Sequence, residues 1–458
     1  MMCGAAIGAA SLAGCQSAER AVHSPVAMPA SFAASGESTL PEHWWSSFED
    51  PGLDAAMEMA LRDNFDLHTA WDRLNQARAL ARTEGADLWP GVDGTEAAGR
   101  SYTRTDGADE YANNFSVGLA MSYEVDLWGR VRSARDAAVL DAQAGEEDVR
   151  TAAITLSATV ATTWYRLAEQ LAQVELIQQQ LETNRQVLEV LTLQFRQGQI
   201  QAADVLRQRQ LVEQSEGQLT LAEGNARLTR HELAVLLGRP PREDLGLPEP
   251  RLVTAGPLPA TGVPSELLQR RPDLLSARLA IQAADRRTAS AIADQYPRVS
   301  LSASVQTGGS QARDLFDNWV ANLAGNLSQP LFDGGRREAE VDRNEAVLSE
   351  SINAYGSAVL TALQEVEDAL SEESHLLRYH GSLQQQLETV RQVYERTRDS
   401  YLNGQLDYIR VLEALVSQQS LQRDELTSRR ELLEARIELC KALAGSWELT
   451  APAPRTLD

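Results

Sequence analysis

The sequence contains almost no lysine, few aromatic residues and only three cysteines. Among 42 basic residues Lys441 is the one lysine, so Schiff-base chemistry would depend on a single side chain. Cys3, Cys15 and Cys440 cannot form a disulfide framework, and no cysteine or histidine pair has metal-ligand spacing. GxSxG, HExxH and GxxxxGK motifs are also missing. We therefore predict no catalytic residues, no cofactor and no metal site.

Basic charge and long apolar runs are also scarce. The 65 acidic residues outnumber the 42 basic ones, and a net charge of −23 argues against nucleic acid as a partner. No segment after the N-terminus offers 18 uninterrupted apolar residues, the minimum for a transmembrane helix. The 458 residues are 43% hydrophobic, which is enough for a large core, and glutamine, glutamate, alanine, leucine and arginine favour long helices.

The N-terminus carries an export signal. Residues 1–14 form a short uncharged run that ends in Leu-Ala-Gly before Cys15, a pattern that resembles a bacterial lipoprotein signal. Cleavage would make Cys15 the lipidated first residue, and Gln16 after it points to the outer membrane by the same resemblance. The alternative is an ordinary apolar N-terminus with a chance cysteine.

The sequence contains an internal repeat. The segment QQQLETNRQV at 178–187 returns as QQQLETVRQV at 384–393, an offset of 384 − 178 = 206. The same offset relates the glycines Gly198 and Gly404, and seven of the seventeen prolines lie from Arg239 to Pro264, where the copies meet. The predicted boundaries are a signal peptide (1–14), a lipidated N-terminus and collar segment (15–51), a first repeat (52–238), a Pro-rich linker (239–263), a second repeat (264–444) and a tail (445–458).

Each copy predicts a long helical hairpin. No proline interrupts about 68 residues from Arg130 or from Arg336, which makes a helix of about 100 Å. Apolar residues at 3-4 spacing from Val174 to Phe195 predict coiled-coil packing against a returning helix. Gly198 and Gly404 are predicted as the turns at the hairpin tips.

Each copy also predicts two strands. Apolar residues alternate with polar ones over 115–125 and 299–306, with polar loops around 103–114 and 307–318. A half-buried soluble sheet gives the same alternation, but the outer-membrane signal favours membrane strands. Four strands cannot close a barrel, and hydrocarbon does not tolerate an open edge, so membrane strands require assembly with further copies.

Several motifs carry a family resemblance. The runs HWWSSFEDP at 43–51, ALRDNFDL at 60–67 and LQRRPDL at 268–274 resemble the signatures of TolC-like outer-membrane efflux factors, specifically the lipoprotein branch. The resemblance implies an α+β membrane protein, a homotrimer with a twelve-stranded transmembrane β-barrel and a periplasmic α-barrel built from the hairpins. The implied partners are outer-membrane lipid, a periplasmic adaptor and an inner-membrane pump of the resistance-nodulation-division type.

The resemblance also assigns a gate at the tips. By position from the tip glycines, Asp204 and Tyr401 match the family's latch, in which a tyrosine hydroxyl donates to a carboxylate. Glu413 matches an acidic ring at the entrance, and Asp407 lies near it. Leu406 stands where the family has a latch arginine and Arg410 where it has a second carboxylate, so one link is missing and the acidic ring is weaker.

The expected function is a passive, gated exit duct of a tripartite efflux system for drugs or other small molecules. Two alternatives remain open. One is a type I secretion duct for proteins. The other is a lipid-anchored periplasmic coiled-coil scaffold without a pore.

Overall fold

The computed structural model describes residues 24–445 and 447–451. The predicted signal peptide and the lipidation site Cys15 lie outside this part of the chain. The chain divides into two compact units, one built mainly of Ala77–Ala142 and Arg278–Ala354, the other of Val26–Gln76, Gln143–Ala277 and Tyr355–Asp458. Within the described residues, no helix combines the length and the apolar character needed to cross a membrane.

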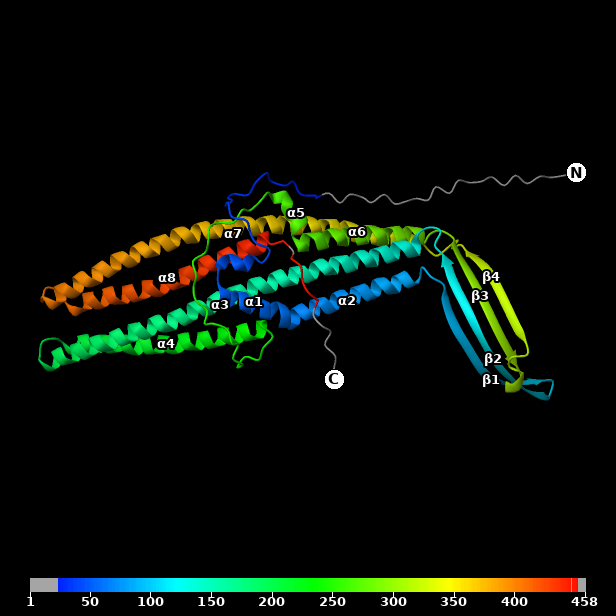
Figure 1. Ribbon diagram of the computed structural model, residues 1–458, viewed down its shortest axis with the longest axis horizontal. Coiled ribbons are helices and arrows are strands. Elements are labelled where there is room, and N and C mark those ends of the chain that lie inside the picture. Colours follow the sequence, from blue (N-terminus) through cyan, green and yellow to red (C-terminus); the bar gives the residue numbers. More distant parts are fainter. Residues whose placement is uncertain (1–23, 446, 452–458) are drawn as a thin grey trace. The chain divides into compact units, whose positions relative to one another are not determined.

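The element order is the same in both halves of the chain: a helix, two strands, a very long helix and a returning helix (Figure 1). The first half contains η1 (Trp44–Phe48), α1 (Pro51–Asp63), α2 (Phe65–Ala86), β1 (Gly91–Thr105), β2 (Ala108–Val125), α3 (Arg130–Arg196) and α4 (Ala202–Leu236). The second contains η2 (Pro264–Glu266), α5 (Leu267–Arg270), α6 (Pro272–Ala293), β3 (Arg298–Gly309), η3 (Ala312–Asp314), β4 (Trp319–Ser328), α7 (Arg336–Leu402) and α8 (Tyr408–Leu443).

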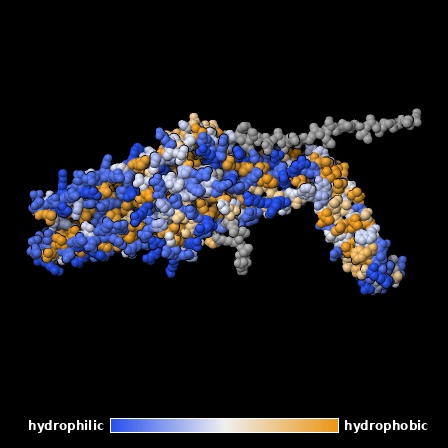
Figure 2. Space-filling view, in the orientation of Figure 1, coloured by the Kyte–Doolittle hydropathy of each residue, from blue (hydrophilic) through white to orange (hydrophobic). Residues whose placement is uncertain are grey.

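The first unit contains one antiparallel sheet in the order β1-β2-β3-β4. Its register places apolar residues on one face and polar residues on the other, because successive side chains of a strand point to opposite faces. One row across the sheet is Val92, Met121, Ala303 and Leu323, and the adjacent row is Asp93, Ala120, Ser304 and Asn322. Figure 2 shows hydrophobic residues gathered over these strands, with hydrophilic residues at the hairpin turns. The period-two alternation is therefore confirmed.

The polar loop predicted at 103–114 is wrong. β1 continues to Thr105 and β2 begins at Ala108, so Asp106 and Gly107 alone form the turn. Both have positive φ, +51° and +89°, as a two-residue hairpin turn requires. The prediction failed because the strand ends are polar on both faces. Between β3 and β4 a longer connection does occur, and it includes η3.

The second unit contains most of the helical hairpins, although α3 and α7 begin in the first unit. α3 runs beside α4, and α7 runs beside α8 (Figure 1). α3 and α7 are each a single continuous helix of 67 residues, as the proline-free runs predict. The predicted coiled-coil stripe of α3 is buried at Ile177, Leu181 and Leu191, but its last member, Phe195, is exposed. The stripe ends one residue earlier, where Gln194 contacts α7.

The core of this unit lies where η1 and α1 meet α3 and α8. Trp44 and Trp45 are buried there, and the Trp44 indole donates to Ser157 Oγ at 3.1 Å. The two tryptophans therefore anchor the segment before α1 in this core. Cys440 is also buried in this core.

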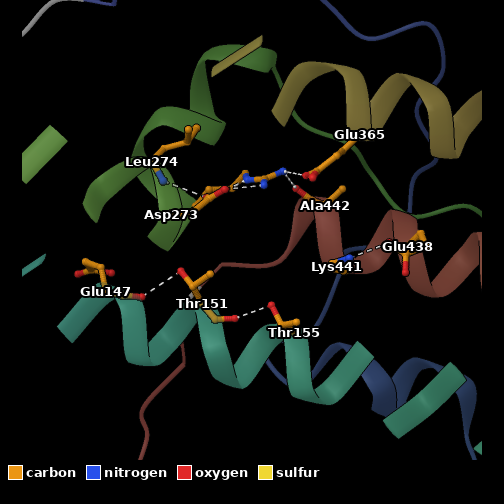
Figure 3. A network of polar contacts seen from close by, with 10 residues as sticks. Glu147, Thr151, Thr155, Asp273, Leu274, Glu365, Glu438, Lys441 and Ala442 are labelled. Atoms are coloured by element: carbon orange, nitrogen blue, oxygen red, sulfur yellow. Dashed lines mark hydrogen bonds and ion pairs between the residues drawn. The ribbon is translucent and has the colours of Figure 1, made fainter. Parts of the chain in front are cut away.

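Asn64 and Arg271, at corresponding places in the two halves of the chain, each bond to the end of a returning helix. Asn64 accepts from the Leu67 amide at 3.0 Å at the start of α2 and donates to the Leu236 carbonyl at the end of α4, at 2.9 Å. In the second half Arg271 pairs with Asp273 at 2.7 Å, with Glu365 at 2.6 Å, and with the Ala442 carbonyl at 3.4 Å. These three acceptors are labelled in Figure 3. Since 442 − 236 = 206, the two contacts to α4 and α8 correspond under the sequence repeat.

Candidate functional site: the tips of the helical hairpins

The two hairpin tips have the same backbone design. Gly198 and Gly404 follow the ends of α3 and α7 with φ of +74° and +69°. The next amide in each case bonds back across the turn, from Gln199 to the Gln194 carbonyl at 3.0 Å and from Gln405 to the Ser400 carbonyl at 2.8 Å. This six-to-one bond with a left-handed glycine ends a helix as a Schellman motif. An alanine at either glycine would be strained.

A small apolar cluster holds the tips together. Leu191, Val205, Tyr408 and Val411 are buried, and they come from α3, α4 and α8. Tyr401 at the end of α7 packs on this cluster with its ring 5.6 Å from that of Tyr408. The cluster therefore brings all four long helices into contact at their tips.

The predicted latch pair lies at this cluster, with different immediate partners from those expected. The Tyr401 hydroxyl donates to Gln194 Oε1 at 3.1 Å, and the Asp204 carboxylate pairs with Arg207 at 3.5 Å. Burial raises the pKa of Tyr401, and the nearby charge of Asp204 raises it further. Tyr401 thus lies within electrostatic reach of Asp204 while its hydroxyl binds an amide of α3.

Tyr408 and Gln208 belong to the same site, although sequence reasoning did not select them. The Tyr408 hydroxyl donates to Gln208 Oε1 at 2.5 Å, and Gln208 Nε2 donates to the Asn184 carbonyl at 2.8 Å. Burial raises the pKa of Tyr408, so its hydroxyl stays protonated and remains a donor. The sequence signal for this site is a polar residue, such as Gln208, at a helix position where the spacing predicts an apolar one.

The two carboxylates predicted to line an entrance, Glu413 and Asp407, differ in their contacts. Glu413 pairs with Arg410 at 3.1 Å, and both side chains are exposed. Asp407 is the N-cap residue of α8, but its side chain makes no capping hydrogen bond. Leu406 is also exposed beside the turn. The charge of Glu413 is therefore partly offset by the arginine that departs from the family pattern.

The described residues contain no group of three or more histidine, cysteine, aspartate or glutamate side chains that could hold a metal ion. Long paired helical hairpins with glycine tips and a sheet with an apolar face are the features that the sequence predicts for an outer-membrane channel subunit. The comparisons with known proteins identify the kind of channel.

The family model described as outer membrane efflux protein matches the chain twice, at residues 56–239 and 263–445. The chain is 32% identical over 450 residues to the pyoverdine export outer membrane protein OpmQ of Pseudomonas aeruginosa, covering 95% of each protein. It is 30% identical over 416 residues to the toluene efflux pump outer membrane protein TtgI of Pseudomonas putida, covering 88% of this chain and 87% of that one. A solved structure of CusC superposes with a TM-score of 0.85 at 26% identity, covering 93% of this chain and 99% of that one.

The chain belongs to the outer membrane efflux protein family. It is an outer-membrane component of an efflux system, and it has the fold of the efflux channels. Members of the family are channels and not enzymes, in agreement with the prediction from the sequence.

Proposed function

We propose that three copies of this chain form a passive, gated exit duct. In this proposal twelve strands close a β-barrel in the outer membrane, and twelve helices form a periplasmic α-barrel. Cys15 is lipidated and anchors the N-terminus. A periplasmic adaptor and an inner-membrane pump of the resistance-nodulation-division type supply the cargo and the energy.

The observation that carries the proposal is the four-stranded sheet. Its one apolar face suits lipid and its polar face suits a water-filled lumen. β1 and β4 are edges with no further strand beside them in the described chain. Hydrocarbon does not tolerate unpaired backbone groups, so the two edges require strands from other copies.

The outer face of α4 supports assembly as well. Leu221, Leu228 and Val235 are exposed at a spacing of seven residues. Large apolar side chains repeated at heptad spacing are suited to packing against another helix. A neighbouring copy would bury this stripe.

The two repeats at 52–238 and 264–444, joined by the linker at 239–263, are part of the proposal. The two family matches and the common element order support an origin by duplication. In the assembled duct each chain then contributes two similar hairpins, so three chains give a ring with approximate six-fold symmetry.

The named relatives export pyoverdine and toluene, which are chemically unlike each other. We infer that the duct accepts many small molecules and that the pump selects among them. Asp204 and Tyr401, at the tips, form the gate region, and the bond from Tyr401 to Gln194 ties the second hairpin to the first. Glu413 and Asp407 line the entrance.

Two measurements test the proposal. The particle mass in detergent is expected to equal three chains, and a mass of one chain would contradict the barrel. Single-channel conductance in planar bilayers is expected to be small and to rise in the double variant Asp204→Ala, Tyr401→Phe. Unchanged conductance would keep the duct and remove the gate assignment.

A further inference from the structure

A line of buried polar side chains runs along the contact between α3 and α8. Coiled-coil contacts are normally apolar, so buried amides there are unusual. Asn184 is fully buried, and Gln180, Gln419 and Glu169 are at most 7% exposed. We call the whole set the polar ladder: Glu169, Gln173, Gln180 and Asn184 of α3 with Gln419, Gln422, Arg423, Thr427 and Arg430 of α8.

The middle of the ladder is centred on Gln180. Its Nε2 donates to Gln422 Oε1 at 2.9 Å and to the Gln419 carbonyl at 3.2 Å. Its Oε1 accepts from Arg423 Nη1 at 2.7 Å. Burial lowers the pKa of Arg423, so this guanidinium is partly desolvated and depends on its neutral partner. One side chain of α3 thus satisfies three groups of α8.

The ladder continues in both directions from Gln180. Toward the N-terminal end of α3, Gln173 donates to the Arg423 carbonyl at 2.9 Å, and Glu169 pairs with Arg430 at 3.1 Å. Toward the tips, Gln419 Nε2 donates to Asn184 Oδ1 at 2.9 Å.

The lower end of the ladder reaches the tip cluster directly. The Asn184 carbonyl accepts from Gln208, and Gln208 accepts from the hydroxyl of Tyr408. Tyr408 in turn contacts the ring of Tyr401. The ladder is therefore connected through Gln208 to Tyr408 in the tip cluster.

Most residues of the ladder are not repeated in the other copy of the sequence. Under the offset of 206, Gln180 corresponds to Gln386 of α7, which is exposed and donates to Ser382 on its own helix. Asn184 corresponds to Val390, and Arg423 corresponds to Gly217. The duplication alone therefore does not account for the ladder.

We propose that the polar ladder is a second closing element, above the tips, which sets the register of α8 against α3 and thereby holds the duct closed. Polar groups in a coiled-coil contact fix register at a cost in stability, because only one alignment satisfies them. Gln180 lies 16 residues before the end of α3, about 24 Å from the tip. A change of register there moves the whole lower part of α8, including Tyr408. This inference rests on the proposed exit duct.

The test replaces the centre of the ladder with apolar residues of similar size. In Gln180→Leu, Arg423→Leu both partners are removed together, so no charge is left buried alone. The matched control is Gln386→Leu, Arg391→Leu, which makes the same two changes at exposed positions of α7. A third variant, Gln180→Glu, keeps the acceptor for Arg423 but loses both bonds that Nε2 donates to α8.

Single-channel conductance is measured in planar bilayers after circular dichroism confirms equal helix content. We expect a several-fold rise for Gln180→Leu, Arg423→Leu, a smaller rise for Gln180→Glu, and wild-type conductance for the control. If the ladder variant does not assemble, Asn184→Leu, Gln419→Leu is measured in its place.

Conductance of the ladder variant equal to wild type would overturn the ladder as a closing element and leave the exit duct intact. An equal rise in the control would also overturn it, because the effect would not be specific to the contact between α3 and α8. No conductance from inserted wild-type protein would instead refute the exit duct itself.

Discussion

Arg436 of α8 offers a sharp test of how the linker is held. Its guanidinium pairs with Glu373 of α7, and both side chains are almost fully buried. The same guanidinium donates to the carbonyls of Gly256 and Pro257 in the linker, at 2.8 and 2.9 Å. Arg436 therefore supplies two charged hydrogen bonds that attach the linker to the second hairpin.

Replacing Arg436 with methionine removes both bonds to the linker. A hydrogen bond from a charged donor contributes about 1.5–3 kcal/mol. Even at the lower value, losing two such bonds reduces the free energy needed to release the linker by about 3 kcal/mol. That energy corresponds to roughly a 100-fold increase in the population of the open linker. The Glu373 carboxylate is also left buried without its partner, which adds to the destabilisation.

Hydrogen exchange measured by mass spectrometry reports this release. The Ala260 amide bonds to the Ser38 carbonyl at 2.7 Å, and the Gly36 amide bonds to the Pro259 carbonyl at 3.0 Å. Both amides are expected to exchange roughly 100-fold faster in Arg436→Met, because exchange follows the open population.

The control variant for this experiment is Arg429→Met. Arg429 reaches a single linker carbonyl, that of Leu252, at the longer distance of 3.3 Å. Little change in exchange is expected from its loss. Equal exchange in Arg436→Met and wild type, with unchanged helix content, would show that the bonds from Arg436 do not hold the linker in place.

Three further predictions concern single residues. Arg410→Ala removes the positive charge beside Glu413, so the reversal potential in a salt gradient should shift toward cation preference. No shift would place Glu413 outside the conducting path. Cys440 is buried and its pKa is raised to about 12, so a maleimide at neutral pH should label it only after denaturation, and rapid labelling of folded protein would contradict the described core. Cys15→Ser should remove the mass of the attached lipid from the mature chain, and an unchanged mass would exclude lipidation at that residue.

The long elements of this fold could be predicted from the sequence. Proline-free runs marked the length of α3 and α7, and the glycines Gly198 and Gly404 marked where these helices end. Alternation marked the apolar face of β2 and β3, since the strand period is two. Both signals depend on local spacing alone.

Contacts between distant segments could not be predicted in the same way. Gln194 and Tyr401 are far apart in the sequence, and no local pattern indicates that they bond. Gln180 and Gln419 interrupt apolar stripes, which reveals a polar contact but not its partner. The family resemblance selected Asp204 for the tyrosine hydroxyl, whereas here an amide side chain of α3 accepts it.

Whether this chain forms a pore is decided by the conductance of purified wild-type protein inserted in planar bilayers. We predict discrete single-channel steps from particles that contain three chains. Confirmed insertion without any conductance, even when Asp204 and Tyr401 are replaced, would contradict a pore and favour a lipid-anchored scaffold.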